Sequence, residues 1–509
     1  MNQMKLLLDQ VTQFSNDIGM KFGESKCSFM EVERGKVITS TEPIIINNVT
    51  IKPMKVGDSY KYLGQDENLG YNGPVNKERV CNEYYKRVKK IWKSELSAYN
   101  KHIAHNAFAI PVLTPTFGLL NWTKDEIEHI DIQTRKILCM TGNFHRNSDI
   151  DRLYLQRKNG GRGLKCIRTS YEARIIAAKI HLQRQSIKNK YLACVLKHEE
   201  KKLIRVGREL LESMNIEEVE NSEPKLLSRT YVRELLKQKA EAFKNKPLHG
   251  YFRKKVIENE EVDQKLTEQW TNNKYISSHF EAYACAIHEQ EIGTKDLINR
   301  RERKNNQQPS TDNKCRLCKY QVEDVIHVIS SCSKMSSRYY LPIRHDVVAK
   351  YVYEAMRKKK NPECKIEYKG DEFIDEENGI EYWWNVAIKT AVKVRHNRPD
   401  LVVWNNETKN CFIIEFSCPA DVNVTRKAAE KLENYGPLIR TLQLTYPEFK
   451  FSFIPVIIGA LGTVPKNLLE NIKQLNFNEK EAKNIIKAIQ QRAIIGSVKI
   501  CKTFLNFKP

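Results

Sequence analysis

The spacing of hydrophobic residues predicts mostly helices in the first 300 residues and a mixture of helices and strands after them. Basic segments with interspersed aromatic residues, such as NEYYKRVKKIWKSEL and DEIEHIDIQTRKILCM, have helical spacing between Val75 and about Tyr191. Residues 195–300 are highly charged with widely spaced apolar positions, which favours a helical linker or arm over a dense core. The first 60 residues instead combine a helical start with short β-rich pieces.

A polar stretch, RRERKNNQQPSTDNK at 300–314, predicts an exposed hinge. After it, the pattern indicates a compact Cys/His cluster, a mixed α/β region to about residue 470 and a C-terminal helix around NEKEAKNIIKAIQQRAII. No run approaches the ~18 apolar residues of a membrane-spanning helix. The most apolar run, FSFIPVIIGALG at 451–462, is interrupted by Pro455 and Gly459. We therefore expect a soluble protein with several domains and no membrane partner.

The charge balance changes this picture by adding a class of partner. The 509 residues include 85 Lys and Arg against 62 Asp and Glu, a formal charge of +23. Such a surface should attract polyanions, so nucleic acid is the first candidate partner. The charge excess alone fits a merely basic soluble protein equally well. Hydrophobic residues at 41% permit sizeable cores and argue against extensive disorder.

Cysteine usage indicates a reducing compartment and one candidate metal site. Of the 13 cysteines, most are scattered singly, and no secretory signal opens the chain. Four residues form a Cys-x2-Cys-x8-His-x4-Cys pattern: Cys315, Cys318, His327 and Cys332. Three thiolates and one imidazole complete a tetrahedral shell, which is typical of structural zinc. The alternative is chance clustering, with His327 as an ordinary residue of the helical segment VEDVIHVISSC.

The zinc group leaves two roles open. Knuckles of this size usually hold single-stranded nucleic acid or position a neighbouring element. The spacing does not choose between these roles. Because the metal would fold the segment, its loss should melt this element locally.

A second candidate site is a pair of carboxylates. Two β-rich runs, LVVW and CFIIEF, surround the polar turn NNETKN, and a hairpin centred on Glu407 and Thr408 sets Asp400 opposite Glu415. Facing residues have Cβ atoms about 4.5 to 5.5 Å apart. Two acids this close favour a shared divalent cation, magnesium or manganese. The alternative is that Glu415 is a lone acid on an edge strand and Asp400 a loop residue.

The next predicted helix, VNVTRKAAEKLENY, places Lys427, Lys431 and Tyr435 on one face. A lysine aimed at the carboxylates could position the attacking water or stabilise a pentavalent phosphate. The alternative is a solvated basic face. Gly436 and Pro437 predict that this helix ends early. Acid, acid and lysine on strand, strand and helix form the metal-dependent nuclease pattern of the restriction-enzyme core.

With these motifs in order, the chain resembles the C-terminal part of the polyproteins of non-LTR retrotransposons that carry a restriction-like endonuclease behind a reverse transcriptase. That family has a Cys-Cys-His-Cys knuckle, then an Arg/Lys-His-Asp/Asn motif, then an Arg/Lys-Pro-Asp motif with a second acid beyond it. The matching residues after the knuckle are Arg344, His345 and Asp346, followed by Arg398, Pro399 and Asp400 with Glu415.

Flanking segments extend the resemblance over nearly the whole chain. FIIEFSCPADVNVTRKAAEKLENYGPL and FIPVIIGALGTVPKNL are similar to the family's endonuclease core. The likeness to its thumb and linker lies in YKYLG at 60–64, PVLTPTFGLLNWTKDEIEHIDIQTRKIL at 111–138, RLYLQRKNGGRGL at 152–164 and KPLHGYF at 246–252. FSNDIGMKFGESKC at 14–27 resembles the end of a polymerase palm.

The chain departs from the family pattern in two places. The polymerase's aromatic-x-Asp-Asp box and the fingers are not present, and DNA synthesis needs those carboxylates to hold two metals. This chain by itself is therefore not expected to polymerise. In addition, Ser417 stands where many nucleases of this type have a lysine. The family shifts this lysine onto the next helix, four residues before a tyrosine, which selects Lys431 over Lys427.

The resemblance implies a multidomain α + α/β protein with a PD-(D/E)xK restriction-endonuclease-like α/β core. Its parts would be a reverse transcriptase palm remnant at 1–70, a helical thumb-like domain at 71–190, a basic helical linker at 191–310, a CCHC zinc knuckle at 311–335, a restriction-like endonuclease at 336–475 and a C-terminal helix at 476–509.

The implied function is that of a truncated retrotransposon polyprotein whose endonuclease nicks target DNA to prime reverse transcription. Asp400 and Glu415 would hold magnesium or manganese, and Lys431 would assist the attacking water. Further nucleic-acid contacts, to target DNA and retrotransposon RNA, would come from Arg344, His345, Arg398, Arg87, Lys89, Lys90 and Lys93. The implied location is nuclear. The alternative is a non-enzymatic nucleic-acid-binding remnant with an inactive nuclease.

Overall fold

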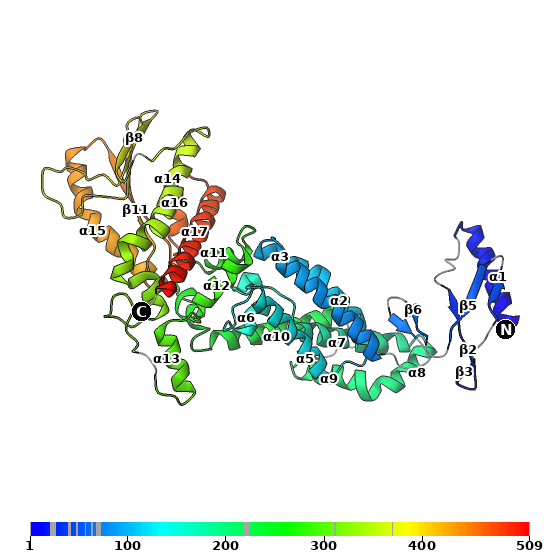
Figure 1. The fold of residues 1–509 in the computed structure, drawn as a ribbon. Coiled ribbons are helices and arrows are strands. Elements are labelled where there is room, and N and C mark those ends of the chain that lie inside the picture. The colour runs from blue at the N-terminus through cyan, green and yellow to red at the C-terminus, as the bar shows by residue number, and fades with distance from the viewer. Residues whose placement is uncertain are drawn as a thin grey trace. The chain divides into compact units, whose positions relative to one another are not determined.

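The computed structural model describes residues 2–20, 27–38, 42–46, 49–55, 58–62, 65–67, 73–217, 223–309, 312–368 and 370–507 (Figure 1). The fold mixes helix and sheet. It forms two compact units, one of residues 1–86 with 115–123 and the other of residues 87–114 with 124–509. Parts of the segments 14–27 and 60–64, which carry the likeness to palm and thumb, lie outside the described residues. Within the described ranges, no helix has the length and apolar character needed to span a membrane.

The first unit contains small sheets and one N-terminal helix. Its elements are α1 (Asn2–Asp17), the three-stranded sheet of β1 (Ser28–Phe29), β5 (Val49–Pro53) and β4 (Ile44–Ile46), and the hairpins β2 (Glu31–Glu33) with β3 (Lys36–Ile38) and β6 (Tyr60–Tyr62) with β7 (Gln65–Glu67). A small cluster of Phe29, Ile44 and Ile51 forms its described core. Helix α2 (Gly73–Lys93) follows.

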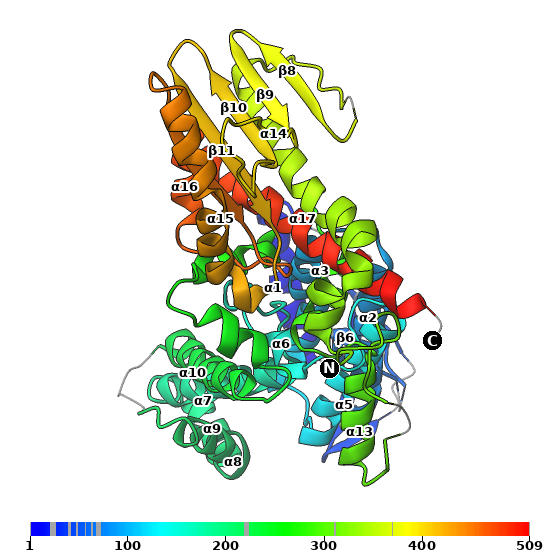
Figure 2. The same ribbon diagram turned by 90° about the vertical axis from the view of Figure 1, so that its left-hand side faces the viewer.

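The helical part of the second unit precedes the large sheet in sequence. Its helices are α3 (Ala98–Ala104), α4 (Ile110–Leu113), α5 (Lys124–Met140), α6 (Ile150–Tyr154), α7 (Ile167–Ser186), α8 (Lys190–Glu199), α9 (Arg205–Glu212), α10 (Pro224–Lys244), α11 (Gln264–Glu268), α12 (Ser278–His288) and α13 (Lys295–Lys304). Figure 2 shows α7 to α10 lying together, and apolar side chains of α7, α9 and α10 form their shared core.

Buried ion pairs join sequence segments that are far apart. Arg157 and Arg162, from the glycine-containing loop after α6, both donate to Glu281 on α12. All three side chains are buried. Arg152 donates to Glu289 at 3.1 Å in the same region. A buried charge is expensive unless it is paired in this way.

The second half of the segment expected to be a linker forms a dense core. Phe252, Trp270 and Ile287 are buried in one cluster with side chains of the Cys/His segment and the C-terminal helix. The expectation of a linker without a dense core is therefore wrong for about 250–292. Its apolar residues are widely spaced because several short helices, rather than one long face, contribute them.

A five-stranded sheet forms the centre of the C-terminal region. Its strands, in spatial order, are β12 (Lys450–Ile457), β11 (Asn410–Ser417), β10 (Leu401–Asn405), β9 (Ile380–Trp384) and β8 (Phe373–Glu377). Only β11 and β12 are parallel, and α15 (Val424–Thr445) connects them. Crossover connections of this kind usually contain a helix because parallel strands cannot be joined by a short turn.

The sheet is covered on both faces, and its central strands β10 and β11 are largely buried and strongly apolar (Figure 2). Val402 and Trp404 point toward α15. Leu401 and Val403 point toward the other layer, which consists of α14 (Asp346–Lys360), α16 (Leu468–Gln474) and α17 (Glu479–Asn506). The expected C-terminal helix is confirmed as α17, which begins with a capping box between Asn478 and Glu481.

Helix α15 continues through Gly436 and Pro437, so the expectation that it ends early is wrong. Proline inside a helix costs about 3 kcal/mol because it removes a hydrogen bond and crowds the preceding turn. Tyr435, Leu438 and Leu442, from both sides of the break, pack into the same core against the sheet. This packing compensates for the local cost.

Candidate active site and metal centre

The Cys/His group has the geometry of a metal shell. One ligand atom from each of Cys315, Cys318, His327 and Cys332 lies within 4.8 Å of the others, and all four residues are buried. The sulfur atoms of Cys315 and Cys332 are 3.9 Å apart, and His327 Nε2 is 3.4 Å from Cys318 Sγ. These separations suit a tetrahedral ion with Zn–S bonds of about 2.3 Å. The group could bind one zinc ion.

Neighbouring residues orient these ligands. His327 Nδ1 lies 2.7 Å from Gln321 Oε1, which leaves Nε2 directed at the thiols. The amides of Leu317 and Cys318 donate to Cys315 Sγ. Arg316 pairs with buried Glu323 and stacks over Phe504 of α17. The segment is therefore fixed to the C-terminal helix.

The hairpin expected around Glu407 is confirmed with the expected register. Strands β10 and β11 pair antiparallel, with Leu401 facing Ile414 and Asn405 facing Asn410. Asp400 immediately precedes β10, and its amide donates to Glu415 Oε1 at 3.1 Å. Glu415 and Ile413 are two residues apart on β11, so their side chains point to the same face of the sheet, which is the face covered by α15.

Helix α15 brings one of the two candidate lysines to the acids. Lys431 Nζ lies 2.5 Å from Glu415 Oε2. Lys427, one turn earlier, instead pairs with Glu430 at 2.6 Å. The next turn carries Tyr435, whose hydroxyl donates to the carbonyl of Arg398. The structure thus brings together Asp400, Glu415 and Lys431, whereas Lys427 points elsewhere.

His345 also reaches the acids, which sequence reasoning missed. Its Nε2 lies 3.4 Å from Asp400 Oδ2, and its Nδ1 lies 2.9 Å from Asp346 Oδ1. The resemblance implied instead that His345 contacts the phosphate backbone of nucleic acid. Its position in a motif with Asp346 was the only available signal of a role at the acids.

In this site, two neighbouring carboxylates lie beside two basic side chains, those of Lys431 and His345. Burial and the neighbouring Asp400 raise the pKa of Glu415 to about 7, although Lys431 acts in the opposite direction. Burial also acts to raise the pKa of Asp400, but His345 and Lys431 outweigh it and leave that pKa below its usual value. For His345, burial opposes the charged form, yet Asp346 and Asp400 raise its pKa to about 10.

The other residues predicted to contact nucleic acid lie in different environments. Arg344 is 2% exposed and donates to the Ile329 carbonyl and to Ser497 Oγ, so its side chain lies inside the protein. Arg398 pairs with Glu372 and donates to the Asn385 carbonyl. Four exposed cations lie on α2, an element separate from the sheet: Arg87, Lys89, Lys90 and Lys93.

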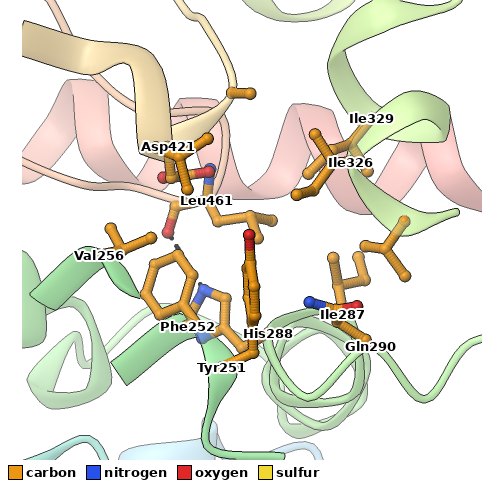
Figure 3. Close-up of a pocket in the computed structure, with 13 residues that line it drawn as sticks. Tyr251, Phe252, Val256, Ile287, His288, Gln290, Ile326, Ile329, Asp421 and Leu461 are labelled. Carbon is orange, nitrogen blue, oxygen red and sulfur yellow. Dashed lines mark hydrogen bonds between the residues drawn. The ribbon is translucent and has the colours of Figure 1, made fainter. Parts of the chain in front are cut away.

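A small, partly open pocket lies apart from these acids (Figure 3). Its lining is mainly apolar, and Phe252 stacks on His288 with ring centroids 4.1 Å apart. His288 Nε2 lies 3.2 Å from the Leu461 carbonyl oxygen. Asp421, at its edge, accepts from the amides of Leu461 and Thr463. His288 and Asp421 are thus engaged within the protein, and the residues that line the pocket include none of the candidate catalytic residues.

The comparisons with known proteins give no family. The chain matches no protein-family model and none of the curated proteins.

Proposed function

We propose that this chain is a metal-dependent endonuclease that hydrolyses phosphodiester bonds of duplex DNA, in the context of a non-LTR retrotransposon. The observation that carries the proposal is the meeting of Asp400, Glu415 and Lys431 at adjacent strands and the following helix. Their order along the chain is that of the restriction-like core. The finer assignment of domains, from thumb to nuclease, belongs to the same proposal.

The acids fit a divalent cation on the chemistry of their surroundings. Glu415 is 1% exposed, and the charge of Asp400 opposes its ionisation. Lys431 supplies one positive charge to this pair, and a second cation would allow both acids to be ionised together. Carboxylate oxygens are the ligands that magnesium and manganese prefer. Bound there, the ion would supply positive charge to the scissile phosphate and to the attacking water.

The chain's own residues would prepare the reaction. His345 and the amide of Phe416 both lie against Asp400 Oδ2, at 3.4 and 2.8 Å, and so fix its orientation. Lys431 would direct its ammonium toward a phosphate oxygen or the water once substrate enters. Tyr435 positions the end of the preceding loop through its bond to the Arg398 carbonyl.

The basic surface supports the choice of polymer. The charge of +23 should make binding strong at low salt and weaker as salt rises, because bound counterions are released. The exposed cations of α2 would hold template and primer in the intact element. Access to chromosomal target DNA would place the protein in the nucleus.

A nicking assay on supercoiled plasmid with magnesium tests the proposal. We expect the wild type to convert the plasmid to the open circular form and Asp400→Ala to reduce the rate at least about 100-fold, as loss of one electrostatic contact does elsewhere. Glu433→Gln, an exposed acid on α15, is the matched control and should retain activity. Equal rates for Asp400→Ala and wild type would contradict the assignment.

The same assay addresses the non-enzymatic alternative. A wild-type protein that binds duplex DNA tightly at about 50 mM salt but never nicks it would support a binding remnant with an inactive nuclease. Folding of each variant is checked by its thermal unfolding curve, so that loss of activity is not mistaken for loss of structure.

A further inference from the structure

The segment 385–399 connects β9 to β10 without helix or strand and leads directly into Asp400. The proposed chemistry assigns no role to the residues between Asn385 and Asn397. Yet the segment is held in a defined conformation and carries several cations. These two properties together make it a candidate nucleic-acid contact.

Hydrogen bonds join the two ends of this segment. The amide of Ile388 donates to the Asn397 carbonyl at 2.8 Å, and Asn397 Nδ2 donates back to the Ile388 carbonyl at 3.1 Å. Ile388 itself is buried in the core beneath α15. Arg398 Nε donates to the Asn385 carbonyl at 2.8 Å. The residues between Ile388 and Asn397 therefore form a loop whose two ends are fixed.

This loop is positively charged and uncompensated. Lys389, Lys393 and Arg395 are exposed, and the segment contains no acidic residue. Ion pairs involving the described residues include many other lysines, such as Lys473 with Glu470, but none of these three. Unpaired cations on a fixed surface raise the local positive potential and attract phosphate groups.

The base of the segment lies beside the candidate catalytic group. Tyr435 donates to the Arg398 carbonyl at 2.8 Å, and its ring centroid is 6.2 Å from that of His396. Tyr435 lies one helical turn beyond Lys431 on α15. The base of this segment therefore lies beside the helical turn that follows Lys431.

We propose that residues 385–399 hold the phosphate backbone of duplex DNA beside the candidate site, with Lys389, Lys393 and Arg395 as the phosphate contacts. The choice of duplex DNA rests on the proposed function. The contacts are to phosphates, so they position the duplex and select no sequence. Arg398, which is engaged with Glu372 and Asn385, stabilises the loop and is not one of these contacts.

Binding measured without divalent ions tests this surface independently of cleavage. The variant Lys389→Ala/Lys393→Ala/Arg395→Ala removes three positive charges. The matched control, Lys466→Ala/Lys480→Ala/Lys499→Ala, removes the same charge from exposed positions elsewhere in this unit. Both are titrated with a fluorescent duplex of about 30 base pairs, between about 50 and 200 mM salt. Thermal unfolding verifies that both are folded.

We expect the loop variant to lose at least about tenfold in affinity at 50 mM salt, and the slope of log K against log salt to fall by about two to three. The control should lose much less affinity. Equal losses in both variants would overturn the proposal, since net charge alone would then explain binding. An unchanged affinity of the loop variant for the duplex would also overturn it. If the loop variant loses affinity but the wild type never nicks DNA, this surface stands and the nuclease assignment fails.

Discussion

The two candidate metal sites of this chain differ in how they are assembled. The Cys/His group takes its four ligands from residues 315–332, and each is at most 5% exposed. The acid group combines the residue just before β10, a residue near the end of β11, helix α15 and His345 from before α14. One site is local and closed, whereas the other is assembled from distant segments.

This difference in assembly accompanies a difference in access. In the acid group, the side chains of Asp400, Lys431 and His345 remain 24%, 22% and 19% exposed. A closed shell with no free position is typical of structural zinc, whereas a reaction requires room for substrate. The contacts of the Cys/His group with the core of α12 and α17 also favour the positioning role over the binding of single-stranded nucleic acid.

The largest expected effect is the loss of the Cys/His group. Replacement of Cys318 by serine removes one ligand, so zinc should fall from about one per chain to a small fraction. Structural zinc contributes on the order of 10 kcal/mol to folding of such segments. We therefore expect a lower unfolding temperature as well. Elemental analysis and thermal unfolding measure the two effects, with exposed Cys194→Ser as control. A full zinc complement in Cys318→Ser would contradict the assignment.

Removal of an acid should have the opposite effect to loss of the Cys/His group, because it should lower activity much more than stability. Glu415→Gln keeps the shape of the side chain but removes its charge, so nicking should fall about 100- to 1,000-fold. Stability should not fall greatly, because the buried acid is itself destabilised by desolvation and by Asp400. DNA affinity should be unchanged or slightly higher, since a negative charge near phosphate is lost. If Glu415→Gln lowers the unfolding temperature but still nicks DNA at the wild-type rate while it is folded, Glu415 is structural.

The sequence predicts what is encoded locally. The short turn around Glu407 determines the register of β10 and β11, so the chain pattern alone is enough to pair Asp400 with Glu415. The zinc ligands follow from spacing alone because the group is compact. The helical pattern around NEKEAKNIIKAIQQRAII predicts α17.

The sequence does not predict contacts that depend on tertiary packing. His345 meets Asp400 only because α14 and the sheet are packed together. Arg344, its neighbour in the motif, turns into the interior toward Ile329 and Ser497. Nor does local propensity predict that α15 passes through Pro437, where the core around Leu438 stabilises the helix.

The two lysines of α15 provide a sharper test of the acid site. Lys431 contacts Glu415, whereas Lys427 pairs with Glu430 on the surface. We expect Lys431→Ala to reduce nicking about 10- to 100-fold and Lys427→Ala to change it by less than about threefold, as surface pairs contribute little. Single-turnover nicking rates measure both. The reverse ranking would leave the acids in place and reassign the lysine.

The smallest expected effect concerns the ion pairs of His249. Like the acid group, they join residues that are distant in sequence; like the Cys/His group, they stabilise the fold. His249 lies 3.3 Å from Asp149 and 3.1 Å from Glu291. Burial opposes its charged form, but these two acids raise its pKa from 6.5 to about 9. The folded state therefore holds this proton more tightly than the unfolded state. Its stabilising contribution is complete below pH 6.5 and is lost as the pH rises through about 9.

We expect His249→Gln to lower the free energy of unfolding by about 1 to 2 kcal/mol near pH 6, a value reduced for the partial exposure of the ring. The difference from wild type should narrow steadily as the pH approaches 9. Urea unfolding at several pH values measures it, and His129→Gln, exposed on α5, should differ from wild type by less than about 0.5 kcal/mol throughout. A difference that widens with rising pH would contradict a charged His249, because a neutral ring in the folded state reverses the sign of the linkage.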